Sequence, residues 1–215
     1  MSLSRKFLNI WTSFYNTLLN YIFYLPLGGE LSFRRKCINF ANIEKGDQVL
    51  DVCCGTGTLT KLIAKRASRS GRIIGVDLRE SILKVVENTR NLPITFICAN
   101  SENLPFESSR FNKCFISFGL HHMNDQGRRS TLREVRRTLI PNGSLFVVEY
   151  NLPHRIMAKF AARVLVKLEE SEEAYRMLMN RNLIFEIQRT GFKIRRRKFT
   201  GGGMIQLVEA CKTSE

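Results

Sequence analysis

One apolar segment near the start of the chain leads into an acidic residue and a turn that contains two glycines. Residues 49–58 read Val-Leu-Asp-Val-Cys-Cys-Gly-Thr-Gly-Thr, so that Asp51 stands four residues before Gly55 and Gly57 follows closely. Glycines in such a turn let the backbone approach a ligand, and a helix that begins after Thr58 points its free N–H groups at the same place. The pattern predicts a site for a nucleotide-type cofactor.

Two details of this segment distinguish between cofactors. A dinucleotide site has a third glycine three residues after the second, and Thr60 occupies that position here. Asp51, at the expected end of the first strand, could receive the charged amino group of a methionine-like moiety, whereas a dinucleotide carries no cation there. The sequence therefore favours S-adenosylmethionine over NAD.

A second carboxylate follows at the end of the next apolar segment. Residues 72–77 read Arg-Ile-Ile-Gly-Val-Asp, and Asp77 is placed to accept hydrogen bonds from both hydroxyls of a ribose. Leu78 would then lie against the face of an adenine ring.

With both carboxylates in place, the chain resembles the class I S-adenosylmethionine-dependent methyltransferases. Residues 94–106 resemble the third-strand motif of that family, with Asn100 where an acidic residue is usual and Leu-Pro-Phe at the end. An Asn carbonyl can still accept a hydrogen bond from the adenine amino group. The resemblance implies these cofactor-binding residues: Asp51, Cys53, Gly55, Thr56, Gly57, Asp77, Leu78, Asn100, Ser101, Glu102, Ser117 and Phe118.

Three further segments resemble the ubiquinone/menaquinone biosynthesis C-methyltransferases within that class. They are Asp-Val-Cys-Cys-Gly-Thr-Gly from residue 51, Ile-Ser-Phe-Gly-Leu from residue 116 and Val-Val-Glu-Tyr-Asn-Leu-Pro from residue 147. The resemblance spans about residues 40 to 155, and residues 199–204 show a weaker similarity. It implies methyl transfer to a small aromatic or lipophilic acceptor, and its most specific prediction is C-methylation of a quinone precursor. His121 and His122 replace the Arg-Asn pair typical of those enzymes. The segment between the expected fifth strand and Gly191 is shorter than their substrate-covering insertion.

The candidates for catalysis lie outside the cofactor motifs. Methylation of an aromatic ring carbon becomes easier when a neighbouring hydroxyl loses its proton, and an imidazole, which titrates near pH 6.5, is a suitable base. His121 and His122 are the candidate bases, and the alternative is that they only shape the pocket. Glu149 or Tyr150 could face the same cleft. Tyr15, with Tyr21 and Tyr24, could contact an aromatic acceptor or simply pack in the lid.

Alternating strands and helices from Asp47 onward must position these residues. Strands are expected near 47–53, 72–77, 94–98, 112–118 and 143–150, with helices between them. A C-terminal hairpin of 192–199 with 203–211 would complete a seven-stranded sheet, after helices at about 154–168 and up to about 190. This predicts a Rossmann-like, doubly wound α/β fold with a mostly parallel sheet and ligands at the carboxyl ends of its strands.

The first 46 residues are expected to form a helical lid, and residues 47–215 one compact methyltransferase domain. No charged residue occurs from Phe7 to Gly29, but a polar stripe at Asn9, Ser13, Asn16 and Asn20 argues against a membrane span, and no cleavage site follows. The segment is predicted to pack over the cofactor cleft. A membrane-surface helix is the alternative.

The six cysteines, at positions 37, 53, 54, 98, 114 and 211, form no Cys-x-x-Cys pair and mostly fall in predicted strands. We interpret them as reduced, buried small side chains of a cytoplasmic protein. A metal site at Cys53 and Cys54 is not expected, because neighbouring residues on a strand point to opposite faces.

The net charge of +15 favours an anionic partner. Peripheral contact with an anionic membrane would suit a lipophilic acceptor. RNA methylation is the alternative, although Ser117-Phe118-Gly119-Leu120 stands where amine methylases of bases carry Asn/Asp-Pro-Pro-aromatic, and no proline precedes a cysteine. A non-catalytic, cofactor-binding or membrane-associated protein is an alternative of another class, because Asn100 and the His-His pair depart from the family pattern.

Overall fold

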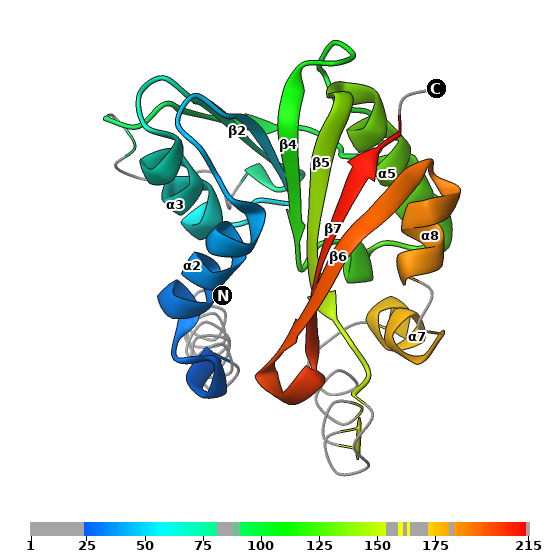
Figure 1. The fold of residues 1–215 in the computed structure, drawn as a ribbon. Coiled ribbons are helices and arrows are strands. Elements are labelled where there is room, and N and C mark those ends of the chain that lie inside the picture. Colours follow the sequence, from blue (N-terminus) through cyan, green and yellow to red (C-terminus); the bar gives the residue numbers. More distant parts are fainter. Residues whose placement is uncertain are drawn as a thin grey trace, which may run out of the picture.

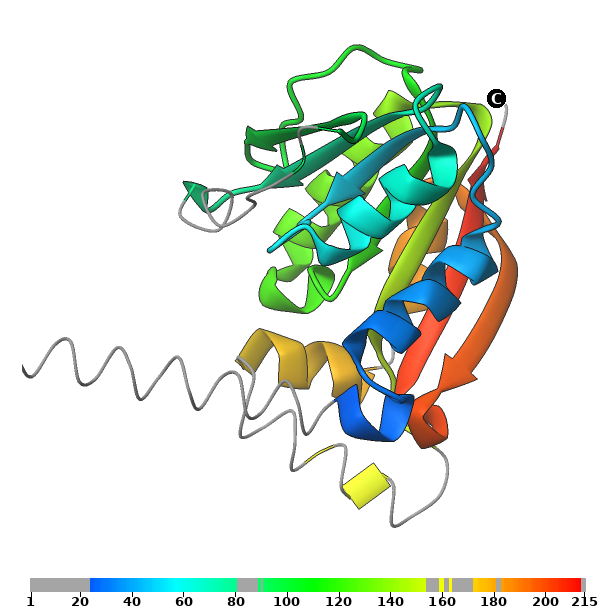
Figure 2. The same cartoon turned by 90° about the vertical axis from the view of Figure 1, so that its left-hand side faces the viewer.

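The computed structural model describes residues 24–80, 89, 91–153, 159, 160, 163, 172–180 and 183–213. Figures 1 and 2 show the fold in two views at right angles. Tyr15, Tyr21 and the helix expected at 154–168 lie outside these residues or almost entirely so.

Seven strands form one sheet in the order β3-β2-β1-β4-β5-β7-β6 (Figure 1). The strands β1 to β5 pair in parallel, and β7 pairs antiparallel with both β5 and β6. The predicted fold, a mostly parallel sheet with a C-terminal antiparallel hairpin, is therefore confirmed. The strands are β1 (Gln48–Val52), β2 (Arg72–Asp77), β3 (Ile94–Cys98), β4 (Phe111–Ser117), β5 (Leu139–Tyr150), β6 (Phe192–Thr200) and β7 (Ile205–Lys212).

The order of the strands places the ligand cleft. After β1 the chain adds β2 and β3 on one side and then returns to add β4 and β5 on the other. The loops after β1 and β4 therefore leave the sheet in opposite directions, and a crevice opens between them at the carboxyl ends. Both loops carry candidate residues.

Helices cover both faces of the sheet (Figures 1 and 2). On one face, α2 and α3 pack through Phe33, Ile38 and Ile63 against Phe115 and Phe146 of the sheet. On the other, α5 and α8 pack through Leu132, Val135 and Ile187 against the sheet. The helices described are α2 (Glu30–Ala41), α3 (Thr58–Ala67), α5 (Asp125–Thr138), α7 (Glu172–Asn180) and α8 (Leu183–Arg189), with the short 3-10 turns η1 (Leu25–Leu27), η2 (Leu120–His122) and η3 (Gly201–Gly203).

Three local expectations need correction. The segment expected as one helix up to about 190 is described as α7 and α8, on either side of residues 181 and 182. β5 begins at Leu139 rather than near 143. Its pairing with β4 shifts register between Phe111 and Lys113, and Phe111 still pairs with Leu139 beyond this irregularity. All six cysteines are free, but Cys98 is exposed at the edge of the parallel region instead of buried.

The part of the expected lid that the structure describes is tied to the core. Tyr24, Leu27, Phe33 and Cys37 are buried in the same cluster as the apolar residues of β1 and α3. Burial on this scale anchors α2 firmly, at roughly 1.5–3 kcal/mol for each large apolar side chain. Among the described residues, no helix combines the length and the apolar character needed to cross a membrane.

Candidate functional site

A large open cleft lies at the carboxyl ends of β1, β2 and β4. Its volume is about 1530 Å³. Single-ligand pockets usually measure about 300–1,000 Å³, so this cleft has room for two molecules. All the sequence-predicted cofactor residues line it except Gly57, and so do both candidate histidines.

The glycine turn forms the floor of the cleft. Gly55 and Gly57 have φ of 53° and 72°, in the left-handed region that favours glycine, and Gly57 caps α3. A Cβ at Gly55 would meet no atom within 4 Å, so this backbone is open to a ligand. The backbone N–H of Gly55 donates to Asp77 Oδ2 at 3.0 Å, which joins the turn to the end of β2.

Asp51 lies beneath this turn and is 1% exposed. Thr60 Oγ1 donates to Asp51 Oδ2 at 2.5 Å, whereas Oδ1 has no hydrogen-bond partner. Burial raises the pKa of Asp51 to about 6, although the Thr60 hydrogen bond and the nearby Arg34 charge act in the opposite direction. Thr60 thus supports the carboxylate, a role that its position in place of a third glycine did not reveal.

The carboxylate of Asp77 is well placed for a ribose. Asp77 is 8% exposed, and its two oxygens accept from the backbone N–H groups of Gly55 and Arg79, both at 3.0 Å. Each oxygen retains acceptor capacity for a hydroxyl. Leu78, 67% exposed, flanks the cleft at the position expected for an adenine face.

The loop after β3 lines the far side of this region. Asn100 Oδ1 accepts from the backbone N–H of Glu102 at 2.9 Å, so the carbonyl expected to meet the adenine amino group also stabilises its own turn. Ser101 is buried and shares a 3.0 Å hydrogen bond with Thr131 of α5. These contacts fix the loop, and Asn100 itself stays exposed.

The residues present fit S-adenosylmethionine. Asp77 can hold a ribose, the open Gly55 backbone can lie under the methionine portion, and the unpartnered oxygen of Asp51 supplies negative charge near a cationic end. Burial raises the pKa of the Cys53 thiol to about 12 and also raises that of the Cys54 thiol, which disfavours the reactive thiolate form of both.

A buried histidine–carboxylate pair forms another wall of the cleft. His121 Nδ1 lies 2.7 Å from Glu149 Oε1, and both side chains are 1% exposed. The backbone N–H of Tyr150 also donates to Oε1, at 2.9 Å. Because a carboxylate only accepts, Nδ1 is the donor in this contact and carries a proton. His122 is exposed, with its ring centroid 4.0 Å from that of His121.

Aromatic rings surround this pair. The ring centroid of Tyr150 lies 5.0 Å from that of His121 and 5.3 Å from that of Phe118. Phe118 has φ of 53°, which is unusual for a bulky residue, and its backbone N–H is held by Val148 O at 2.9 Å. The sequence placed Phe118 with the cofactor, but its ring lies between the two groups of candidate residues.

The loops after β1 and β4 touch directly. A Cβ at Gly119 would lie 2.6 Å from Cys53 Cβ and 2.9 Å from its Sγ, closer than real atoms approach. Cys53 itself has φ of 57°. Glycine at position 119 is therefore required by the cysteine facing it.

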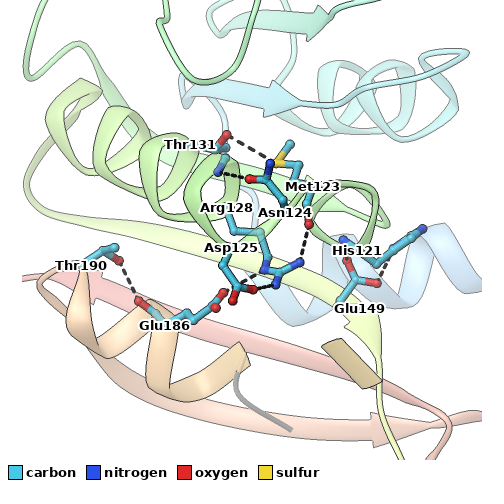
Figure 3. A network of polar contacts seen from close by, with 10 residues as sticks. His121, Met123, Asn124, Asp125, Arg128, Thr131, Glu149, Glu186 and Thr190 are labelled. Carbon is cyan, nitrogen blue, oxygen red and sulfur yellow. Dashed lines mark hydrogen bonds and ion pairs between the residues drawn. The ribbon is translucent and has the colours of Figure 1, made fainter. Parts of the chain in front are cut away.

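A buried arginine supports the loop that carries the two histidines (Figure 3). Arg128 of α5 is 1% exposed, and its Nε donates to Glu186 Oε2 of α8 at 3.0 Å. Its other nitrogens donate to Met123 O and to Asp125. Arg128 thus ties the end of the histidine loop to a helix from the C-terminal part of the chain.

Sequence reasoning missed Arg34 as a member of the site. It lines the cleft from α2, and its Nη1 donates to Ser117 Oγ at the end of β4, at 2.6 Å. No local motif surrounds Arg34, and only its helical position relative to the buried Phe33 and Cys37 could have indicated its direction.

Comparison with known proteins places the chain in a family. The model of the ubiE/COQ5 methyltransferase family matches residues 7–170. The chain is 29% identical to a demethylmenaquinone methyltransferase of Staphylococcus saprophyticus, over 80% of this chain and 81% of the relative. It is 33% identical to the ubiquinone/menaquinone biosynthesis C-methyltransferase UbiE of Pasteurella multocida, over 72% of this chain and 62% of that protein.

Solved structures agree on the fold. A SAM-dependent methyltransferase from Aquifex aeolicus superposes with a TM-score of 0.67 at 15% identity, covering 84% of this chain and 89% of the other. A methyltransferase structure from Bacillus halodurans gives a TM-score of 0.68 at 18% identity, covering 85% of this chain and all of that one. With the cleft, these findings support an enzyme rather than a non-catalytic protein. The chain belongs to the ubiE/COQ5 methyltransferase family and is an S-adenosylmethionine-dependent methyltransferase.

Proposed function

We propose that this enzyme methylates a ring carbon of an aromatic acceptor that carries an ionisable hydroxyl, as a quinol precursor does. The observation that carries the proposal is the His121–Glu149 pair, buried at the wall of the cleft with Nδ1 and Oε1 2.7 Å apart. The relatives are named for demethylmenaquinone and for ubiquinone/menaquinone biosynthesis, and aromatic acceptors of that kind suit the rings of Phe118 and Tyr150.

The proposed chemistry assigns a role to each of these groups. S-adenosylmethionine, when bound, supplies an activated methyl group. His121 Nε2 takes the proton from the ring hydroxyl, and electron density moves to the adjacent ring carbon, which forms the new bond to the methyl carbon while the bond from that carbon to the sulfonium sulfur breaks and the neutral thioether leaves. The ring carbon afterwards loses its own proton to water, which restores the aromatic ring and the hydroxylate, and the hydroxylate takes a proton back from His121. Glu149 stabilises the protonated imidazole, and Phe118 and Tyr150 hold the ring in line with the methyl group.

Acceptors that differ only at the hydroxyl test this role. A demethylated naphthoquinol with a short prenyl chain, its di-O-methyl ether and the oxidised quinone would be incubated with methyl-labelled S-adenosylmethionine. We expect a C-methylated product, identified by mass spectrometry, from the quinol alone, because the other two have no proton for His121 to remove. Methyl transfer to an oxygen of the quinol, equal turnover of the ether, or transfer only to a structured RNA would overturn the proposal.

We also propose that the enzyme meets its acceptor at an anionic membrane surface. The edge strand β6 exposes Lys193, Arg195 and Lys198, and the exposed Phe199 follows them. Next to this strand, η3 packs against η1, since a Cβ at Gly201 would lie 3.0 Å from Leu27, and Leu25 of η1 is 59% exposed at the rim of the cleft. Basic and apolar groups together favour such a surface, at about 1 kcal/mol for each basic residue.

Sedimentation with vesicles tests this contact. We expect more protein to sediment with vesicles that contain phosphatidylglycerol than with neutral vesicles, and less for K193E/K198E, whose side chains make no described ion pair. The matched control is K65E/R69E, at two exposed positions in and just after α3, which changes the net charge equally. Equal binding by the two double variants would assign the effect to net charge and not to this surface.

A further inference from the structure

Arg34 is a largely buried charge in the cleft whose described ion pair, with the half-exposed Glu30, is long. Its side chain is only 15% exposed, and its Nε is buried without a hydrogen bond. The nearest carboxylate oxygen belongs to Glu30, at 3.6 Å from Nε, beyond hydrogen-bond distance. Largely buried cations normally have an anionic partner, because burial without one costs several kcal/mol. This position therefore calls for an anion.

The guanidinium is held in a fixed orientation. Nη1 donates to Ser117 Oγ at 2.6 Å, and the central carbon lies 5.8 Å from the ring centroids of Tyr24 and Phe118. With Nη1 engaged, the edge formed by Nε and Nη2 is the part that makes no described hydrogen bond. Two parallel N–H groups on such an edge match the two oxygens of a carboxylate.

Asp51 presents the opposite charge across the same cleft. Its Oδ1 is also buried without a hydrogen bond, and Arg34 lies close enough to lower the pKa of Asp51. Even so, no ion pair joins Asp51 to Arg34 in the part of the chain that the structure describes. The cleft is thus lined by one positive and one negative group that form no ion pair with each other, and the positive group has only a long ion pair with Glu30.

We propose that Arg34 binds the α-carboxylate of the methionine portion of S-adenosylmethionine, opposite the charge that Asp51 offers to the ammonium group. An α-amino acid carries both charges on groups bonded to the same carbon, which matches a cation and an anion that each have one buried atom without a hydrogen bond. Ser117 at the end of β4 positions the guanidinium above the glycine turn. Glu30, whose side chain is 42% exposed, can turn toward solvent when the carboxylate arrives. The inference rests on the cofactor and is independent of the acceptor.

Binding of two forms of the cofactor tests the assignment by calorimetry, without any acceptor. The ligands are S-adenosylmethionine and its decarboxylated form, which keeps the sulfonium and the amino group. We expect the wild-type protein to bind the decarboxylated form about ten- to 100-fold more weakly, the range for a charge-assisted pair. Arg34→Ala should lose the same factor for S-adenosylmethionine and almost nothing for the decarboxylated ligand.

Two further variants complete the design. Arg34→Lys should recover part of the affinity, because an ammonium keeps the charge but not the two-pronged geometry. Arg35→Ala, at the exposed neighbouring position on α2, is the matched control and should bind both ligands as the wild type does. An equal loss of both ligands in Arg34→Ala would show that Arg34 only shapes the cleft. Should Arg34→Ala fail to fold, equal affinity of the wild type for the two ligands would by itself refute the proposal.

Discussion

The donor side and the acceptor side of the cleft are built in different ways. The donor side, defined as Asp51, residues 53–57, Asp77, Leu78 and residues 100–102, is formed by turns at the ends of β1, β2 and β3, and backbone N–H groups hold its polar side chains. The acceptor side, defined as Phe118, His121, Glu149 and Tyr150, depends instead on a direct contact between two buried side chains, His121 and Glu149.

Under the proposed function, this difference indicates that substrate choice depends on the acceptor side. Backbone turns depend on a few glycines and carboxylates, so the donor side is fixed by the fold itself. The acceptor side is fixed by side-chain pairing and by Arg128 behind it, and we expect its residues to vary more freely than those of the donor side, except at Gly119, which packs against Cys53 of the glycine turn. The His-His pair in place of the Arg-Asn of similar enzymes falls on that side.

The largest expected effect comes from His121→Gln. Loss of a general base should lower kcat by about 10²–10⁴-fold, whereas the Kd of S-adenosylmethionine should change less than about twofold. Single-turnover kinetics and calorimetry measure the two quantities separately. His122→Gln is the matched control, because this neighbour is exposed and should lower kcat far less. A similar loss of cofactor binding in His121→Gln would contradict the division into two sides.

Arg128→Met tests the support of the acceptor side. Removing Arg128 takes away one partner of its buried ion pair with Glu186, and this should reduce the free energy of unfolding by about 3–5 kcal/mol. Denaturant titration measures the loss. The double variant Arg128→Met/Glu186→Leu should regain most of that stability but not the catalytic rate, because the hydrogen bond from Arg128 to Met123 O is still missing. Full recovery of kcat in the double variant would argue against a positioning role.

Asp77→Asn should affect the donor side alone. Weakened hydrogen bonds to a ribose should raise the Kd of S-adenosylmethionine by about ten- to 100-fold, with kcat at saturating cofactor little changed. Glu107→Gln, which removes an exposed carboxylate outside the cleft, serves as the control for net charge. An unchanged Kd would show that Asp77 serves only the Gly55 turn.

The smallest expected effect is a pH dependence of cofactor binding. The pKa of Asp51 is raised by burial to about 6, so that below pH 6 the side chain is largely protonated and offers no charge to an ammonium group. The Kd of S-adenosylmethionine should therefore be about tenfold larger at pH 5 than at pH 7. Calorimetry at a series of pH values measures this, and Asp51→Asn should show a weak but pH-independent affinity.

The raised pKa of Asp51 also makes the stability of the fold depend on pH. A carboxylate whose pKa is about 6 in the folded protein, against an ordinary 3.8, binds its proton more tightly in the folded state. Its contribution therefore favours folding below about pH 4 and opposes it as the pH rises toward 6. The Thr60 hydrogen bond limits this cost.

That the residues of the donor side would line one cleft could be predicted from the sequence, because they lie at or just after the ends of strands that the apolar pattern indicates. Apolar runs ended at Asp77 and Cys98, and the strands β2 and β3 end there as well. Other contacts left no local trace. The bond from Thr60 to Asp51 exists because the first turn of α3 faces back toward β1, and Arg34 reaches Ser117 from a helix that precedes every motif. Such pairings depend on how helices pack, which periodicity does not specify.

The contact between Cys53 and Gly119 makes the two loops share one small volume. A side chain can occupy it from the loop after β1 or from the loop after β4, but not from both. The residue size that position 119 tolerates therefore depends on the residue at position 53. Gly119→Ala alone should destabilise the fold, and adding Cys53→Gly should restore much of the lost stability. Any redesign of the acceptor loop that adds bulk at position 119 has to begin in the glycine turn that holds the methyl donor.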